Sequence, residues 1–367
     1  MANLEKAKKL RVGIIGCGGI ANGKHMPNLK KIKELEMVAF CDIIGERAAE
    51  AAEKFGTPDA KVYEDYKELL KDESIDAVHV CTPNRSHSFI TVDALEAGKH
   101  VMCEKPMAKT YADAKRMLEA AQRTGKKLTI GYQQRWRGES LFLKEMCDQG
   151  ELGEIYYARA ISLRRRAVPT WGVFLNEYEQ GGGPLIDIGT HALDLTLWLM
   201  DNYSPKMVVG TSYRKLADQK RAGNAWGDWD PEKFTTEDSC FGFIVMENGA
   251  TISLESSWAL NIAQPDEAVC LLAGTKAGAD MLDPDHELRI NSVKHGRQCI
   301  EYPNFKSGGA AFFEGSSSDN SELEARGFYK AILEDTEVPT KPEQALVVTQ
   351  ILEAIYDSAK SGQPVYF

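Results

Sequence analysis

A strand that turns sharply into a helix over residues 11–21 constrains the fold of this chain more than any other stretch. The strand is rich in β-branched apolar residues, as a buried parallel strand requires. The turn then has the spacing Gly16-x-Gly18-x-x-Ala21. The first glycine permits a tight turn, the second lets backbone N–H groups approach a pyrophosphate, and the small third residue allows close helix packing. Glycine-rich turns are common, so the neighbouring strands decide the interpretation.

A second predicted strand, residues 37–42, ends in Asp42. Its separation from the turn along the sequence is about that of a carboxylate that hydrogen-bonds the adenosine ribose. Ile43 and Ile44 follow, so no arginine stands there for a 2′-phosphate, and we expect NAD rather than NADP. The alternative is an ordinary strand-end acid that caps the turn before a helix at Gly45.

Strand and helix patterns alternate through the first half of the chain, which is typical of a doubly wound parallel sheet. We expect further strands at 77–82, 99–103 and 127–130, and helices at 19–33, 45–55, 63–71, 86–97 and 112–124. Ligands of such sheets bind beyond the carboxyl ends of the strands. Thr82-Pro83-Asn84 and Glu104-Lys105-Pro106 follow two of these ends.

Composition narrows the class of protein. A chain of 367 residues is long enough for two domains, and its net charge of −10 argues against a nucleic-acid partner. No apolar run approaches the ~20 residues that span a membrane, and the start resembles no signal segment, so we expect a cytoplasmic protein. Eight cysteines fall singly, which favours free buried thiols over zinc or disulfides.

From residue 153 the pattern changes to short strands joined by turns. The strands expected are 155–160, 206–212, 239–245, 250–258, 268–272 and 298–302. Asn248-Gly249 between two of them is a strong hairpin signal. We predict a mainly antiparallel sheet, with a helix over 184–200 between it and the nucleotide domain. Packing helices are expected over 322–334 and 342–360.

Five motifs together resemble those of the Gfo/Idh/MocA oxidoreductases, which include inositol dehydrogenases and glucose–fructose oxidoreductase. They are the turn at 16–21, Cys81-Thr82-Pro83-Asn84, Glu104-Lys105-Pro106, Gly131-Tyr132-Gln133-Gln134-Arg135 and the segment Gly181 to His191. The resemblance covers most of the chain. It implies an α/β Rossmann domain over 1–133 and an α+β domain over 134–367, whose large open-faced sheet serves substrate binding and oligomerisation. We therefore expect a homo-oligomer.

Lys105, Asp187 and His191 are the candidate catalytic residues. Pro106 holds Lys105 in an extended segment, where its charge can stabilise a developing alkoxide. Histidine can accept the hydroxyl proton that leaves as a hydride departs, and Asp187, one helical turn earlier, can orient the imidazole. The resemblance implies these roles.

Each of these residues also has a plainer interpretation. Lys105 can be a solvated surface lysine, Asp187 a helix cap and His191 a core histidine. A metal ion could be bound by Asp187, His191 and Asp194. No second histidine-rich segment supplies the remaining ligands, so we expect no metal.

The expected NAD-binding residues surround the glycine turn and the strand ends. They are Gly16, Gly18, Gly19, Ile20, Ala21, Asp42, Thr82, Pro83, Asn84, His87, Glu104, Lys105 and Arg135. His87, which follows the strand end, can instead be a helix-start histidine that only packs.

Two loops of the second half are expected to set specificity. Arg164-Arg165-Arg166 leads into Trp171, and a glycine- and acid-rich loop carries Trp226 and Trp229. Indole rings pack on the C–H faces of sugars, so a carbohydrate or aryl glycoside fits better than a small keto acid. The expected substrate set is Lys105, Arg164, Trp171, Asp187, His191 and Trp226. The arginines can alternatively grip a phosphate or carboxylate, or lie at a solvated edge or subunit contact, and the tryptophans can anchor an interface.

We therefore expect an NAD-dependent oxidoreductase that transfers a hydride between nicotinamide and a secondary hydroxyl of a sugar, glycoside or cyclitol. The aromatic loop favours a narrower hypothesis, oxidation of the carbon-3 hydroxyl of a glucoside, as in bacterial family members that begin deglycosylation this way. The alternatives are a glycosidase that retains NAD and oxidises carbon 3 transiently, and a non-catalytic NAD-binding sensor.

Overall fold

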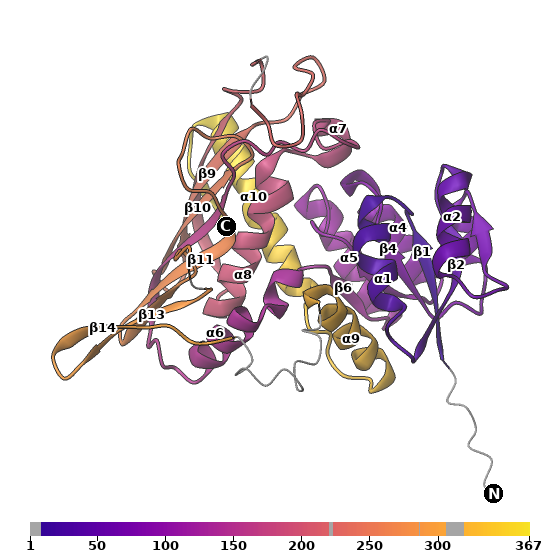
Figure 1. The fold of residues 1–367 in the computed structure, drawn as a ribbon, viewed down its shortest axis with the longest axis horizontal. Coiled ribbons are helices and arrows are strands. Elements are labelled where there is room, and N and C mark those ends of the chain that lie inside the picture. Colours follow the sequence, from indigo (N-terminus) through magenta and orange to yellow (C-terminus); the bar gives the residue numbers. More distant parts are fainter. Residues whose placement is uncertain (1–8, 220–222, 286, 306–318) are drawn as a thin grey trace, which may run out of the picture. The chain divides into compact units, whose positions relative to one another are not determined.

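The computed structural model describes residues 9–219, 223–285, 287–305 and 319–367 (Figure 1). The chain divides into two compact units. The first comprises residues 1–108, 112–131 and 318–343, and the second comprises 109–111, 132–317 and 344–367.

The first unit is built on a six-stranded sheet with the order β3-β2-β1-β4-β5-β6. The strands, which pair in parallel throughout, are β1 (Leu10–Ile15), β2 (Leu35–Cys41), β3 (Lys61–Tyr63), β4 (Ala77–Val80), β5 (His100–Cys103) and β6 (Leu128–Ile130). This order is that of a doubly wound dinucleotide-binding sheet, and it confirms the predicted α/β class. The short strand β3 was not predicted.

Helices pack against this sheet along the chain. They are α2 (Gly45–Phe55), α3 (Tyr66–Leu70), α4 (Asn84–Glu96) and α5 (Tyr111–Thr124). The helix after the glycine turn continues as a π-helical turn, η1 (Ala21–His25), and then α1 (Met26–Leu29). The prediction that this helix extends to residue 33 was wrong. Its end folds into tight turns instead, because the amides of Lys31 and Ile32 bond to carbonyls three residues earlier.

Helix α9 (Asn320–Leu333) belongs to the first unit although it follows the second unit's strands in sequence. Its apolar residues Ala325, Phe328 and Tyr329 are buried in the same core cluster as Val12 and Ile14 of β1. The compact units therefore differ from a linear division at residue 133, because burial of this face outweighs separation along the chain.

The second unit is built on a nine-stranded sheet with the order β14-β13-β12-β11-β7-β10-β9-β8-β15. The strands are β7 (Ile155–Leu163), β8 (Pro205–Tyr213), β9 (Ser239–Met246), β10 (Thr251–Ser257), β11 (Asp266–Gly274), β12 (Ala277–Asp280), β13 (Arg289–Lys294), β14 (Arg297–Glu301) and β15 (Val365–Tyr366). The β7/β10 pair is parallel and the other described pairs are antiparallel. The predicted mainly antiparallel sheet is confirmed, as is the hairpin at Asn248-Gly249, where Gly249 has φ +87°.

The second unit also contains helices, some of which pack against its sheet. They are η2 (Gln133–Trp136), α6 (Gly138–Asp148), α7 (Glu177–Gln180), the π-helical turn η3 (Leu185–Gly189), α8 (Thr190–Met200) and α10 (Pro342–Ser361). Figure 1 shows α8 and α10 on the same side of the strands. Helix α10 approaches closely because Gly210 of β8 and Gly242 of β9 leave room for Ile355.

The structure also bears on the cysteines and on the length and polarity of the helices. All eight cysteines are free, and six of them are buried, as predicted. Over the described ranges, the helices are too short or too polar to cross a membrane.

We predict that Phe328→Ala lowers the free energy of unfolding by about 3–5 kcal/mol, because Phe328 is fully buried in the first unit's core. The matched control is Leu333→Ala in the same helix, whose side chain is 53% exposed and whose loss should cost about 0.5 kcal/mol or less. Urea unfolding followed by far-UV circular dichroism measures both. Equal losses for the two variants would contradict the placement of α9.

Candidate active site

The glycine turn forms a cradle at the carboxyl end of β1. Gly16 has φ +92°, and a Cβ there would come within 2.8 Å of the Cys81 backbone after β4, so only glycine fits. Cβ atoms on Gly18 and Gly19 would meet only open space. The helix begins directly after the turn, and Asn22 Nδ2 donates to the carbonyls of Cys17 and Gly18 at 2.8 and 3.1 Å. An open glycine surface at a helix N-terminus suits a dinucleotide pyrophosphate.

Asp42 braces this turn from the end of β2. One carboxylate oxygen accepts the amide of Cys17 at 2.9 Å, and the other accepts the amide of Ile44 at 2.9 Å. Each oxygen keeps a second lone pair that can accept a ribose hydroxyl, so bracing and ribose binding are compatible. The next residue, Ile43, is 89% exposed and offers apolar surface rather than positive charge. These residues fit NAD.

His87 joins the two loops that follow β4 and β5. Its ring nitrogens lie 2.8 Å from the Thr82 carbonyl oxygen and 2.8 Å from that of Pro106, and the side chain is fully buried. Burial lowers its pKa, although the two carbonyls oppose this. The structure thus gives His87 a positioning role, and its contact with cofactor stays a prediction.

Glu104 lies buried directly before the Lys105-Pro106 peptide bond, which is cis. Its Oε1 is 2.8 Å from Lys24 Nζ and 2.7 Å from His25 Nε2, while its Oε2 accepts the Lys105 amide at 3.1 Å. Lys24 and His25 are consecutive residues of the π-helical turn η1. The helix that starts at the glycine turn is therefore tied to the backbone of Lys105. This contact was not predicted from the sequence. Lys24 and His25 stand side by side there, but nothing local indicates that both bind Glu104.

The same buried network reaches helix α9. His25 Nδ1 lies 2.9 Å from His79 Nδ1 on β4, and His79 Nε2 lies 2.7 Å from the Tyr329 hydroxyl. Burial lowers the pKa of His25 and lowers that of His79 well below its ordinary value, so both rings are neutral at neutral pH. Burial alone would raise the pKa of Glu104, but Lys24 and His25 hold it well below its ordinary range.

The second unit carries Asp187 and His191 on one continuous helix. Asp187 lies within the π-helical turn η3, which closes where the Thr190 amide bonds to the Leu185 carbonyl, and His191 is the second residue of α8. Asp187 Oδ2 accepts a hydrogen bond from the buried Trp258 indole at 3.0 Å. His191 is 7% exposed and meets the Tyr132 ring edge to face at 6.0 Å. π-helical turns inside helices are frequent at functional sites.

Glu237 holds the start of this helix. Its carboxylate accepts the amides of Gly183 at 2.7 Å and Leu185 at 3.2 Å, and the Tyr356 hydroxyl at 2.8 Å. A carboxylate at a helix N-terminus is favoured by the unpaired amides there. The sequence offered no signal for this residue, because it lies more than 50 residues from the amides it binds.

Arg135 and Asp194 form a bidentate ion pair beside the same helix. Arg135 Nε and Nη2 lie 2.8 and 2.6 Å from the two oxygens of Asp194, and Nη1 donates to Gln344 at 2.7 Å. Burial alone would lower the pKa of Arg135, but the charge of Asp194 raises it overall. Both carboxylate oxygens of Asp194 thus bind Arg135. The contact of Arg135 with cofactor stays a prediction. Over the described ranges, no three His, Cys, Asp or Glu side chains gather as a metal would require.

The loop residues predicted to set specificity separate into two environments. Trp171 and Trp226 are 51% and 44% exposed and contact each other, with Arg164 beside Trp226. Trp229 is instead 6% exposed, and its indole donates to the Ala217 carbonyl. Of the two tryptophans in that loop, only Trp226 is available to a ligand.

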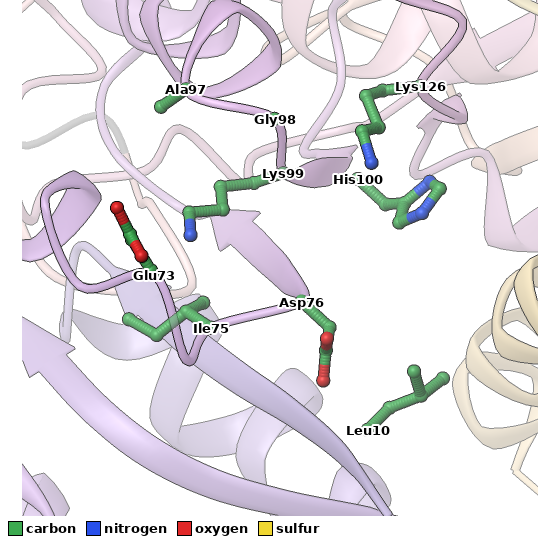
Figure 2. A pocket seen from close by; sticks show the side chains of 9 residues that line it. All are labelled: Leu10, Glu73, Ile75, Asp76, Ala97, Gly98, Lys99, His100 and Lys126. Carbon is green, nitrogen blue, oxygen red and sulfur yellow. The ribbon is translucent and has the colours of Figure 1, made fainter.

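The first unit also contains a cavity of about 340 Å³ (Figure 2). Its lining includes Leu10 and His100, the first residues of β1 and β5, and Asp76 just before β4. These positions mark the amino ends of the strands, opposite to the glycine turn. The charged groups around it in Figure 2 therefore do not belong to the candidate active site.

Two family models match the chain. The model described as "Oxidoreductase family, NAD-binding Rossmann fold" (GFO_IDH_MocA) matches residues 10–132, and "Oxidoreductase family, C-terminal alpha/beta domain" (GFO_IDH_MocA_C) matches residues 144–367. Together they span most of the chain.

Named relatives and solved structures agree with these matches. D-glucoside 3-dehydrogenase from Escherichia coli K12 is 37% identical over 366 residues, covering 100% of this chain and 99% of the relative. Inositol 2-dehydrogenase from Salmonella typhimurium is 34% identical over 193 residues, covering 52% of this chain and 55% of the relative. The structure of levoglucosan dehydrogenase with NADH and L-sorbose has a TM-score of 0.82 at 22% identity, covering 98% of this chain and 99% of that one, a likeness of fold.

We predict that the free energy of unfolding falls as pH drops from about 7.5 to about 5.5. Buried His25 and His79 stay neutral in the folded chain, whereas the unfolded chain binds protons below their ordinary pKa of 6.5. Each contributes a slope of up to about 1.4 kcal/mol per pH unit below that value. Urea unfolding at several pH values measures the slope.

His79→Gln should make this slope shallower by about one proton, whatever its effect on stability at neutral pH. His295→Gln, at an exposed position of the second unit, serves as control and should leave the slope unchanged. A His79→Gln slope equal to that of the wild type would contradict a neutral, buried His79.

Proposed function

Because the chain belongs to the Gfo/Idh/MocA oxidoreductase family and uses NAD, we propose that it oxidises the carbon-3 hydroxyl of D-glucosides. The observation that carries this proposal is the match to D-glucoside 3-dehydrogenase over the whole chain. The match to inositol 2-dehydrogenase extends over about half of it. Because the proposed substrate contacts come from both units, similarity over the whole chain is the more informative.

Cofactor binding is assigned to the carboxyl edge of the first unit's sheet. The open surface of Gly18 and Gly19 and the helix N-terminus behind it would hold the pyrophosphate, and Asp42 would hold the ribose. NAD, when bound, accepts the hydride that leaves the sugar carbon. Glu104 and His87 keep the adjoining loop in place through the Lys105 amide and the Pro106 carbonyl.

The chemistry is assigned to Lys105, His191 and Asp187. Lys105 hydrogen-bonds the reacting hydroxyl, and its charge stabilises the alkoxide that develops as the hydride departs. His191 accepts the hydroxyl proton, for which an imidazole is suited near neutral pH. Asp187, fixed by Trp258, hydrogen-bonds a neighbouring hydroxyl or orients the imidazole, and so sets which carbon reacts.

We predict that the wild type with NAD produces NADH from D-glucosides and leaves free inositols unreacted. Single-turnover mixing, followed by NADH absorbance and product analysis, checks this. A 3-keto glucoside with its aglycone attached is the expected product. Reaction of inositol alone would overturn the proposal, and release of aglycone without net NADH would replace it with a glycosidase that retains NAD.

Lys105→Met and His191→Ala should each lower turnover by ~10²-fold or more while NAD binding persists. Asp42→Ala should do the reverse, weakening NAD binding with less effect on turnover at saturating NAD. Titration of NADH fluorescence and steady-state kinetics separate the two signatures. Similar loss of folded protein in all three variants, seen by circular dichroism, would remove the basis for these roles.

We further infer that the chain forms a homo-oligomer through the sheet face opposite α8 and α10. Alternate residues of β8 and β9 bring Val209 and Phe243 together as a cross-strand pair, 38% and 47% exposed. Adjacent apolar side chains on an uncovered sheet are typical of an interface, and a second copy supplies the same surface.

Phe243→Glu should lower the mass measured by sedimentation velocity, because a charge in the interface would be buried without a partner. Leu141→Glu is the control, since Leu141 is 41% exposed on α6 rather than on the sheet. An unchanged mass for Phe243→Glu would place the interface elsewhere or leave the chain monomeric.

A further inference from the structure

Two exposed tryptophans of the second unit form a pair. The ring centroids of Trp171 and Trp226 lie 4.8 Å apart with the planes at 79°, an edge-to-face arrangement. Trp171 also meets Phe174 edge to face at 5.9 Å. About half of each indole is open to solvent. Large apolar rings that gather at a surface mark a binding site more often than single exposed residues do.

The loops that carry these rings are fastened to each other. The Val168 amide donates to Asn224 Oδ1 at 2.8 Å, and Asn224 Nδ2 donates back to the Val168 carbonyl at 3.0 Å. The Thr170 hydroxyl donates to the Trp226 carbonyl at 2.7 Å. These bonds join the backbones that carry the two rings, and a site organised before the ligand arrives lowers the entropy cost of binding.

The pair rests on the core that holds Asp187. Val168, Trp229, Phe234 and Trp258 are buried in one cluster, with Phe174 packed against it. Trp258 donates to Asp187, so the same cluster supports both the rings and this carboxylate. The aromatic surface and the proposed catalytic helix thus pack on the same core cluster of the second unit.

Arg164 lies beside the aromatic pair, and its positive charge is paired with a carboxylate. Its guanidinium carbon lies 5.3 Å from the Trp226 ring centroid, and Nε and Nη2 each lie 2.6 Å from an oxygen of Glu267. Burial lowers the pKa of Arg164, while Glu267 and then Asp187 raise it overall, which places Asp187 within electrostatic reach. Because Glu267 neutralises this arginine, the region favours a neutral ligand over a phosphate or carboxylate.

We propose that Trp171 and Trp226 form an aglycone subsite, which selects glucosides whose aglycone is a flat aromatic ring. This inference rests on the proposed function, since it assumes that a sugar reacts beside Asp187. An aryl ring bonded to the sugar stacks on one indole and meets the edge of the other. The backing of Trp226 by Arg164 strengthens the pair through cation–π attraction. A second sugar ring presents C–H faces of similar size, and the test separates the two ligands.

The test compares kcat/KM for 4-nitrophenyl β-D-glucoside, methyl β-D-glucoside and cellobiose. We expect Trp226→Ala and Trp171→Ala each to lower the aryl-to-methyl ratio of kcat/KM by about 3- to 10-fold, mainly through KM. Trp226→Phe, which keeps a smaller ring, should give an intermediate ratio. The control Tyr156→Ala removes a 54% exposed ring on β7 and should leave the ratio at its wild-type value.

An unchanged aryl-to-methyl ratio would overturn the subsite, whether kcat/KM falls equally for the aryl and methyl glucosides, falls for cellobiose alone, or does not fall. Calorimetric titration of the NADH-loaded enzyme with 4-nitrophenyl β-D-glucoside separates this failure from failure of the proposed function. Binding that weakens in Trp226→Ala supports the subsite even where carbon 3 is not the reacting carbon. An enzyme that oxidises no glucoside but binds the aryl glucoside equally well in wild type and variant refutes both proposals.

Discussion

A buried carboxylate, Glu104, is the constraint on which the nucleotide half of the site depends. An ionised acid in a protein core is stable only if cations and donors surround it. Lys24 and His25 supply these groups from the π-helical turn that follows the glycine cradle, and Glu104 in turn accepts the amide of Lys105. The element that would hold the pyrophosphate and the loop that would present the lysine therefore share one network. Tyr329 of α9 closes it through His79.

The second unit uses paired carboxylates in the same way. Glu237 accepts amides of the glycine-rich segment that starts the proposed catalytic helix, and Asp194, on that helix, binds Arg135. The Asp187 carboxylate accepts a hydrogen bond from a neutral donor, the Trp258 indole. Both carboxylate oxygens of Asp194 bind the Arg135 guanidinium. We therefore infer a structural role for Asp194, whereas contact of Asp187 with substrate belongs to the proposed function.

The sequence predicted the fold wherever local pattern decides it. Alternating strands and helices, the glycine turn and the Asn248-Gly249 hairpin all express preferences of a few neighbouring residues. Strands such as β12 and β15 were missed because small residues or a length of two residues leave no periodic signal. The place of α9 and the network around Glu104 were also missed. The paired side chains of this network lie 54 to 250 residues apart in sequence, and no local pattern in a single sequence indicates such pairs.

Candidate site residues were predicted by type and spacing, and the structure adds what surrounds them. Trp226 and Trp229 are equivalent in the sequence, yet burial separates a surface ring from a core ring. His87 and Arg135 have the chemistry of ligand contacts, but backbone carbonyls and Asp194 already occupy their polar atoms. Spacing alone cannot show which donors are already satisfied.

Hydride transfer from carbon 3 of a glucoside is the central claim, and an isotope label tests it most directly. A glucoside deuterated only at carbon 3 is mixed with the enzyme and NAD, and the nicotinamide is then examined by mass spectrometry. Our account predicts that the deuterium appears in the reduced cofactor. Reduced cofactor that contains no deuterium, formed from the same labelled glucoside, would show that another carbon is oxidised and would contradict the account.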